Sequence, residues 1–224
     1  MKYLLKIAIV EDHRMFGDVV KKVCVTELGH EIVAEAADGP RAVAMIRQQR
    51  PDLVLLDLQL PKLDGFGVVE AIRESAPEVR FLVLSSHCDA YTVFRTEQAR
   101  LHGFVDKNTS TVESLKQAIT AVSEGRCYFS ESFHAIRSGR HEDTRSFDKL
   151  LSERERVILT LIAKPLTDDE IAARLKISGG TVKKHRFNIL RKLDLRTTPE
   201  LVRYARKHGF TWAGAVAGSA PGAP

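Results

Sequence analysis

Residues able to bind metal ions or phosphate follow four of the hydrophobic runs in the first half of the chain. Glu11 and Asp12 follow KIAIV, and Asp57 follows LVLL. Ser85 follows FLVL, and Lys107 follows GFVD. If these runs are parallel strands of a sheet with helices on both faces, their carboxyl ends share one edge, where ligands bind. We therefore expect three carboxylates, a hydroxyl and a lysine to meet in one pocket.

These residue types favour phosphoryl transfer assisted by a divalent cation. Crowded carboxylates repel one another, and Mg2+ can hold them together while leaving coordination sites for water and phosphate. A lysine and a hydroxyl can bind the remaining phosphate oxygens, so one aspartate is expected to be the acceptor. Taken singly, each residue is more often a helix cap, a turn residue or a solvated side chain. Their joint placement at one sheet edge favours the chemical role.

Five strand-like runs alternate with five helical patterns in the first 125 residues. This alternation predicts an α/β domain with a doubly wound, five-stranded parallel sheet. The strands are expected near 6–10, 31–36, 53–57, 81–85 and 103–106, and the helices near 14–28, 40–49, 66–75, 90–101 and 111–124. This first domain is expected to span 1–128. The polar segment 129–147 is expected to be a linker that could begin with a short helix, and the Ala/Gly/Pro-rich tail 211–224 is expected to be disordered.

Residues 148–210 predict a second, all-α domain of four helices. S/T-x-x-E capping boxes mark two helix starts, at Ser152 and Thr167. A third helix is expected over 178–193, and a fourth begins with Pro199 at its N1 position. The short connection between the second and third helices is typical of a helix-turn-helix.

Positive charge is concentrated in the second domain. The chain holds 34 Lys+Arg against 29 Asp+Glu, a net charge of +5. Residues 150–210 hold 14 of these basic residues and only 7 of the acidic ones, so the basic surplus belongs to this region. Such asymmetry favours a polyanionic partner such as nucleic acid, although a solvated basic surface has the same composition.

The chain lacks the sequence motifs of several other classes of protein. The chain has no GxGxxG after its first strand and no GxxxxGK[ST], which argues against dinucleotide-binding and P-loop enzymes. The three cysteines are far apart and without CxxC spacing, so we expect buried thiols rather than disulfides or zinc ligands. The N-terminus has no secretion signal and no apolar run is long enough to span a membrane, so a cytoplasmic location without membrane contact is expected.

The motifs of the chain resemble those of two-component response regulators of the NarL/FixJ branch. EDHRMFGD, LLDLQLPKLDG, LVLSSH and GFVDK are similar to the receiver domain. LSERERVILTLIA, EIAARL and SGGTVKKHRFNILRKL are similar to the LuxR-type helix-turn-helix output domain. The resemblance covers residues 5–208. It implies a flavodoxin-like receiver with strand order 2-1-3-4-5, joined to a DNA-binding domain.

The resemblance implies a role for each residue near the metal. Asp57 corresponds to the phosphoacceptor, which receives its phosphoryl group from a sensor histidine kinase or a small acyl phosphate and also binds the metal. Asp12 corresponds to the direct Mg2+ ligand and Glu11 to a ligand acting largely through water, with the backbone carbonyl of Gln59 completing the set. Mn2+ can substitute for Mg2+. The protein is then an enzyme only toward itself, in its own phosphorylation and autodephosphorylation.

Further receiver residues match the switch of the family. Lys107 corresponds to the lysine that pairs with a phosphoryl oxygen, and Ser85 to the hydroxyl that donates to another one. Phe104 corresponds to an aromatic residue that moves inward as Ser85 is drawn to the phosphoryl group; simple packing is the alternative. Arg100 and Leu101 depart from the family, which commonly has Gly-Ala there, so the fourth helix is expected to run on or its junction with the fifth strand to repack.

The third helix of the second domain is expected to lie in the major groove of DNA. The residues expected on its core face are Val182, Ile189 and Leu193. The residues expected to read bases are Lys183, Lys184 and Phe187, and those expected to contact phosphates are Thr181, Arg186 and Arg191. Phe187 is also compatible with burial in a dimer or domain contact. Gly179 and Gly180 lower helix stability in its first turn.

Together these inferences describe a DNA-binding response regulator that forms a homodimer on promoter DNA when phosphorylated. Two alternatives remain open. The helical domain could bind another protein, or the chain could bind DNA independently of phosphorylation with the receiver as a dimer scaffold. A LuxR-type sensor of small molecules is disfavoured, because its sensing half has no such acidic pocket.

Overall fold

Residues 4–210 are described by the computed structural model, so the expected disorder of 211–224 lies outside the described residues. The chain divides into two compact units, and each unit has its own hydrophobic core. The first comprises Met1–Cys88 with Arg95–Ile136, and the second comprises Asp89–Phe94 with Arg137–Pro224. None of the helices within residues 4–210 combines the length and apolar character needed to cross a membrane.

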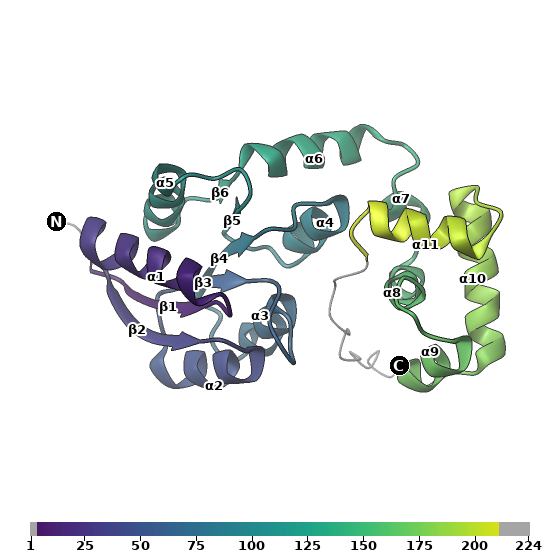
Figure 1. Cartoon of the computed structure of the whole chain (residues 1–224), viewed down its shortest axis with the longest axis horizontal. Coiled ribbons are helices and arrows are strands. Elements are labelled where there is room, and N and C mark those ends of the chain that lie inside the picture. The colour runs from purple at the N-terminus through teal and green to yellow at the C-terminus, as the bar shows by residue number, and fades with distance from the viewer. Residues whose placement is uncertain (1–3, 211–224) are drawn as a thin grey trace. The chain divides into compact units, whose positions relative to one another are not determined.

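A parallel sheet forms the centre of the first unit (Figure 1). Its central strand is buried at every position, as expected for a sheet covered on both faces. The strand order is β2-β1-β3-β4-β5-β6, which confirms the predicted order 2-1-3-4-5 and adds one strand. The strands are β1 (Lys6–Val10), β2 (Glu31–Ala36), β3 (Leu53–Asp57), β4 (Arg80–Ser85), β5 (Gly103–Asp106) and β6 (Tyr128–Phe129).

The sixth strand, β6, differs from the five-stranded prediction. The Tyr128 N–H donates to the carbonyl of His102 at 3.2 Å, and the Ser130 N–H donates to the carbonyl of Phe104 at 3.0 Å. A strand of two residues is too short to show the alternating pattern by which strands are predicted from sequence. The strand forms because the chain after α5 returns to the backbone edge of β5.

Helices cover both faces of this sheet. The helices are α1 (Arg14–Lys22), the π-helical turn η1 (Val23–Glu27), α2 (Gly39–Gln49), α3 (Gly65–Arg73), α4 (Ala90–Gln98) and α5 (Val112–Ser123). Alternate strand residues such as Ile9, Leu55 and Val105 pack with buried residues of α1, η1 and α5 in one cluster. Figure 1 shows α2 and α3 on the opposite side of the sheet.

The fourth helix, α4, does not continue through Arg100 and Leu101, which was one of the two predicted alternatives. We expected α4 to run on through Arg100 and Leu101 or its junction with β5 to repack, but α4 ends at Gln98. Arg100 adopts φ of 45°, a left-handed conformation. Its N–H donates to the carbonyl of Glu97 at 2.9 Å, and the Leu101 N–H donates to the carbonyl of Thr96 at 3.3 Å. These two bonds are those of a Schellman motif, which satisfies the helix end even though its left-handed residue is an arginine.

The second unit is helical, and a helix also occupies most of the expected linker. Its helices are α7 (Phe147–Leu150), α8 (Glu153–Ile162), α9 (Asp168–Leu175), α10 (Gly179–Leu193) and α11 (Thr198–Lys207), together with the residues of α6 (Glu131–Glu142) from Arg137 onward. The segment 129–147 was predicted as a linker with at most a short initial helix, because ESFHAIRSGRHE has no apolar stripe. Only Phe133 and Arg140 are buried along α6, so its packing depends on a few side chains rather than on a periodic face.

The helix starts of the second unit follow their capping residues. Ser152 and Thr167 form the predicted capping boxes, each with the glutamate three residues later. Thr197 forms a further box with Glu200, which makes Thr198 the first helical residue. Pro199 therefore stands at N2 rather than at the predicted N1, a shift of one residue caused by the Thr197 cap.

The core of the second unit includes the beginning of α4. Tyr91 stacks on Phe210 with ring centroids 4.1 Å apart, and its ring lies 5.9 Å from that of Phe147. Buried residues of α8, α9, α10 and α11 complete the same cluster. These aromatic contacts group Asp89–Phe94 with the helical unit.

The three cysteines form no disulfide within the described residues, and only one of them is buried. Cys24 is buried in the first unit, and burial raises the pKa of its thiol to about 12. Cys88 is half-buried and Cys127 is exposed. The prediction of buried thiols is therefore wrong for Cys127, which lies in the turn before β6 rather than in an apolar strand.

Candidate functional site

The carboxyl ends of the strands bring the predicted side chains of the first unit to one edge of the sheet. Asp57 is the last residue of β3, and Ser85 is the last residue of β4. Glu11 follows β1 directly, and Lys107 follows β5 directly. Because all these strands are parallel, residues that follow them meet at a single edge.

Lys107 lies between two carboxylates in this pocket. Its Nζ is 2.7 Å from Oε2 of Glu11 and 2.7 Å from Oδ2 of Asp57. The two acidic residues have only 9% and 6% of their surface exposed. The ammonium also lies 4.5 Å from the centre of the Phe16 ring. One cation therefore faces two largely buried carboxyl groups, and the pocket carries net negative charge when both are ionised.

The carboxyl group of Glu11 has a raised pKa. Burial is the main cause that raises the pKa of its carboxyl from 4.5 to about 7. The hydrogen bond from Lys107 opposes this change in pKa, and the negative charge of Asp57 adds to it. Oε1 of Glu11 also accepts the N–H of His13 at 3.3 Å. A metal ion that binds here near neutral pH competes with a proton, because ligand carboxylates must be ionised.

The acidic residues of the pocket fit a hard divalent cation. Glu11, Asp12 and Asp57 offer oxygens that all lie within 4.8 Å of one another. Asp12 is exposed while the other two are buried, so one side of the group faces solvent. The N–H of Gln59 donates to Oδ1 of Asp57 at 2.9 Å, which brings the backbone at Gln59 beside the Asp57 carboxylate. Oxygen donors on one side and access for water on the other are what Mg2+ requires.

Ser85, predicted to bind a phosphoryl oxygen, and Phe104, the predicted switch residue, are both fully buried. Oγ of Ser85 accepts the N–H of His87 at 3.1 Å. The Phe104 ring lies with its centroid 5.2 Å from that of Phe133 in α6, and Phe133 stacks on Phe129 at 4.6 Å. Phe104 therefore contacts the segment that was predicted as a linker.

Sequence reasoning missed Phe133 for a specific reason. It is a single aromatic residue in a polar segment, so it produces no helical periodicity. The only signal was the nearness of three aromatic residues in CYFSESF, of which Phe129 and Phe133 stack on each other. The contact itself depends on β6 pairing with β5, which places the start of α6 over Phe104.

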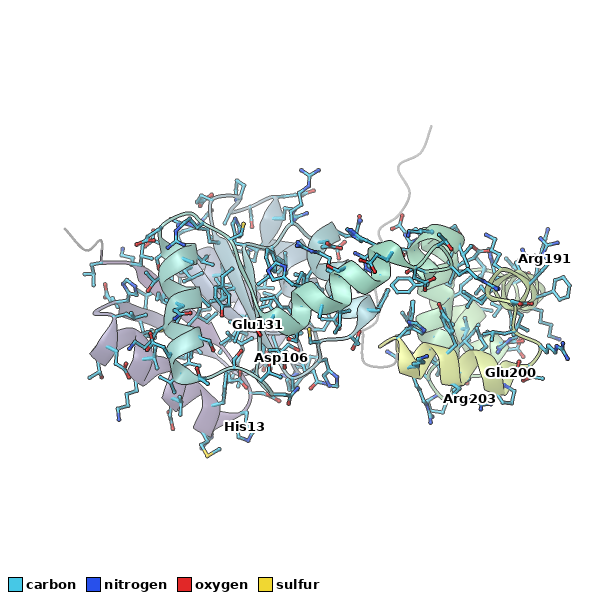
Figure 2. All side chains as sticks on the ribbon, turned by 90° about the horizontal axis from the view of Figure 1, so that it is seen from above. His13, Asp106, Glu131, Arg191, Glu200 and Arg203 are labelled. Carbon is cyan, nitrogen blue, oxygen red and sulfur yellow. The ribbon has the colours of Figure 1, made fainter. Side chains whose placement is uncertain are left out.

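The second unit presents a basic helix face on α10. Ser178 caps the helix, with its Oγ accepting the N–H of Thr181 at 3.1 Å. The buried residues are the three predicted ones, Val182, Ile189 and Leu193. The exposed residues include Lys183, Lys184, Phe187 and Arg191. Arg191 points outward from the unit (Figure 2), and Phe187 is 66% exposed, so the Phe187 ring is not buried within this chain.

Two basic side chains at the flanks of α10 bind carboxylates of neighbouring helices. Nζ of Lys192 is 2.7 Å from Oε2 of Glu155 in α8. Arg186 forms an ion pair with Asp168 in the first turn of α9. Arg186 was predicted to contact phosphate, and in this structure its guanidinium is held against α9. The sequence predicted only the capping role of Glu155. Its ion pair with Lys192 was missed, because the capping box already explains why a carboxylate stands at this position.

Comparisons with known proteins identify the family. Residues 7–120 match the response regulator receiver domain, and residues 149–205 match the bacterial regulatory proteins of the luxR family. The chain therefore belongs to the response regulators that join a receiver domain to a LuxR-type helix-turn-helix domain. The predicted family and fold class are confirmed.

Individual relatives cover nearly the whole chain. The chain is 31% identical over 206 residues to the response regulator protein VraR of Staphylococcus aureus, which covers 92% of this chain and 98% of VraR. Its fold is similar to that of RcsB from Salmonella enterica serovar Typhimurium bound to promoter P1flhDC in the presence of phosphomimetic BeF3−, with a TM-score of 0.65, 20% identity and coverage of 92% and 99% of the two chains. A LuxR-family two-component response regulator from Aurantimonas sp. SI85-9A1 is 30% identical with a TM-score of 0.58, over 62% of this chain and all of that one.

Proposed function

We propose that this response regulator accepts a phosphoryl group on Asp57 and that this modification controls DNA binding by α10. The observation that carries the proposal is the position of Lys107, with Nζ 2.7 Å from both Asp57 and Glu11. An acceptor carboxylate, an acidic group for a metal and a cation for phosphoryl oxygens thus share one pocket. In this proposal 1–128 is the receiver domain, 129–147 connects the domains and 148–210 is the DNA-binding domain.

The transfer needs little covalent chemistry from the protein beyond the acceptor. An oxygen of Asp57 attacks the phosphorus in line while the bond to the donor breaks, the donor being the phosphohistidine of a sensor histidine kinase or a small acyl phosphate. Glu11, Asp12, Asp57 and the backbone carbonyl of Gln59 would hold Mg2+, for which Mn2+ can substitute. When bound, the metal neutralises charge on the phosphoryl oxygens. Autodephosphorylation, by water, ends the signal.

Lys107 and Ser85 respond to the new charge. Phosphorylation adds nearly two negative charges and strong acceptor oxygens to Asp57. Lys107 then pairs with a phosphoryl oxygen, and the Ser85 hydroxyl turns to donate to another one. Phe104 then repositions, and its contact with Phe133 carries the change to α6. A phosphoryl group thereby acts on the connection between the two domains.

DNA recognition is assigned to the exposed face of α10. Lys183, Lys184 and Phe187 would read base edges, and the 66% exposure of Phe187 supports contact with a thymine methyl group. Thr181, Arg186 and Arg191 would contact phosphates, Arg186 after exchanging its partner Asp168 for DNA. We further propose that the phosphorylated protein binds promoter DNA as a homodimer and works in the cytoplasm, where kinase donors and DNA are both present.

Intact-mass measurement tests the phosphoacceptor. With Mg2+ and acetyl phosphate, the chain is expected to gain one phosphoryl adduct that Asp57→Asn lacks. Lys107→Ala is expected to slow adduct formation at least about tenfold, because the cation that offsets the phosphoryl charge is lost. Asp18→Asn, which removes an exposed carboxylate of α1, serves as the control and should behave as the unmodified chain. An adduct that persists in Asp57→Asn would refute the assignment.

A DNA titration separates the alternative functions. Phosphorylation should tighten binding to promoter fragments, and Asp57→Ala should abolish that gain. Equal binding by Asp57→Ala and by the phosphorylated chain would favour a receiver that acts only as a dimer scaffold. No retardation of any fragment would favour a protein partner for the helical domain.

A further inference from the structure

A second hollow of the first unit lies at the opposite end of the sheet from Asp57. It has a volume of about 320 Å³ and lies between α3 and the end of α4, at the amino ends of β4 and β5. Its apolar walls include the buried side chains of Val69, Val79, Phe81 and Leu101. This volume is at the small end of the range for ligand pockets. None of the residues that take part in the phosphoryl pocket lines it.

The polar side chains that line this hollow are basic. They are Arg73, Arg100 and His102, and no carboxylate is among the lining residues. Arg73 donates from Nη2 to the carbonyl of Ala99, which anchors its guanidinium across the gap between α3 and α4. Neither Arg73 nor Arg100 forms an ion pair with another residue in the described part of the chain. Two guanidinium groups beside an apolar wall fit a carboxylate or phosphate, which arginine binds through paired N–H donors.

His102 adds a third donor. Its Nδ1 accepts the N–H of Phe81 at 3.1 Å. Burial lowers the pKa of the imidazole, and the charges of Arg80 and Arg73 lower it further. The ring is therefore neutral at neutral pH and carries its hydrogen on Nε2, which leaves this N–H able to donate. The positive potential that disfavours protonation of His102 also favours an anion.

The backbone at Arg100 is the fourth observation. Its φ of 45° is a left-handed conformation that glycine adopts without strain and that an arginine does not. A charged residue with a long side chain thus occupies a position where the backbone favours glycine. This conformation closes the end of α4, and Arg100 is one of the residues that line the hollow.

We propose that the hollow between α3 and the α4–β5 junction binds a small organic anion, a carboxylate or phosphate monoester carried on a compact apolar group. Arg73, Arg100 and His102 bind the anionic oxygens, and the walls made by Val79 and Phe81 contact the apolar part. The site is separate from the phosphoryl pocket and does not depend on phosphorylation of Asp57. Its ligand fixes the junction between α4 and β5.

Amide chemical shifts of the full-length chain, recorded without Mg2+ and with EDTA, test this site. The probes are benzoate, phenyl phosphate and the uncharged benzamide. At least one anion is expected to shift the amide signals of Arg73, Arg100 and His102 in a saturable way, with benzamide at least about tenfold weaker. The two anions distinguish carboxylate from phosphate ester as the preferred chemistry.

Variants distinguish specific binding in the hollow from a general electrostatic attraction of anions to the protein. Arg100→Gly relieves the left-handed backbone and so keeps the fold, yet it should weaken the bound anion at least about tenfold. Arg73→Gln should weaken it similarly. Arg126→Gln removes an exposed arginine elsewhere in the same unit and should leave the Kd unchanged. Failure of both anions to bind, equal binding of benzamide, or an unchanged Kd in Arg100→Gly would overturn the proposal.

Discussion

Lys107 and Glu11 show how a single half-buried cation organises the receiver pocket. The ammonium is shared by two carboxylates at equal distances of 2.7 Å, so it cannot fully neutralise both. Burial makes the charged form of Glu11 costly, which is why its pKa rises to about 7 while Lys107 remains its hydrogen-bond donor. The pocket thus holds either a proton or a second cation.

Magnesium binding is expected to depend on pH through Glu11. The folded pKa is above the unfolded value of 4.5, so this group stabilises the metal-free fold below pH 4.5, and that stabilisation is lost as pH rises from 4.5 to about 7. Mg2+ offsets this loss only once the proton has left. The increase in Tm at a fixed Mg2+ concentration should therefore be larger at about pH 8 than at about pH 6.

Two variants serve as controls for that measurement. Glu11→Gln removes the titrating group and should flatten the pH dependence of the Mg2+-induced increase in Tm. Asp12→Ala removes the exposed ligand and should abolish the increase at every pH. If Asp12→Ala is stabilised by Mg2+ as much as the unmodified chain, Asp12 is not a ligand.

At the scale of the element, α10 is held by ion pairs on its flanks and leaves its outer face to a partner. Lys192 binds Glu155 of α8, and Arg186 binds Asp168 of α9. The carboxylate of Glu155 also accepts the Ser152 N–H at 2.8 Å. One buried acid therefore fixes both the start of α8 and the end of α10.

Glu155→Gln is expected to destabilise the helical domain by about 1–2 kcal/mol at pH 7, a value limited by the partial exposure of Lys192. Burial tends to raise the pKa of Glu155, but hydrogen bonds from Lys192 and Ser152 outweigh burial and hold the pKa below 4.5. The stabilisation is thus present above pH 4.5 and is lost as pH falls through the lower folded pKa. Urea unfolding at neutral and acidic pH measures this, and the difference between Glu155→Gln and the unmodified chain should vanish in acid.

The two kinds of DNA contact on α10 are expected to respond differently to mutation. Arg191→Ala should weaken binding to operator and random DNA alike and reduce the salt slope by about one unit, because phosphate contacts are electrostatic. Lys184→Ala should cost about 1–3 kcal/mol on the operator and much less on random DNA. Titrations of both duplexes at several salt concentrations distinguish them. Equal losses on both duplexes for Lys184→Ala would mean that another face of α10 reads the bases.

At the scale of the whole molecule, α6 is, like α4, a helix with residues in both units. Its first residues, including Phe133, belong to the first unit, and its residues from Arg137 onward belong to the second. Phe133 packs on Phe104, the predicted switch residue. A helix that starts at the switch can transmit a change that a flexible linker would absorb.

Phe133→Leu is therefore expected to uncouple phosphorylation from DNA binding. Leucine keeps an apolar side chain under α6 but loses the ring contacts with Phe104 and Phe129. The rate of adduct formation on Asp57 should stay within about twofold, while the gain in DNA affinity on phosphorylation should fall at least about fivefold. Fluorescence anisotropy with labelled operator measures the gain, and Ser138→Ala on the exposed side of α6 is the matched control. An unchanged gain in Phe133→Leu would exclude this route.

Local patterns in the sequence were enough to predict which of the candidate site residues lie together. Asp57, Ser85 and Lys107 could be placed together because each ends or follows an apolar run, and parallel strands bring such ends to one edge. The buried face of α10 followed from helical spacing, and its start followed from the Ser178 cap. These features depend on residues close together in the chain, so neighbours in sequence were sufficient.

Only the tertiary structure decided features that join distant segments. The Phe104–Phe133 contact requires β6 to pair with β5, and a two-residue strand leaves no periodic trace. The partners of Glu155 and Arg186 come from other helices, so their carboxylate and guanidinium groups looked like a local cap and a free phosphate contact. Arg100 was expected to prolong α4 or to accompany a repacked junction with β5; its left-handed backbone ends the helix, and Arg100 lines the same pocket as Arg73. These contacts form between side chains that the folded sheet and helices bring together. The spacing of residues along the chain does not predict which side chains will meet.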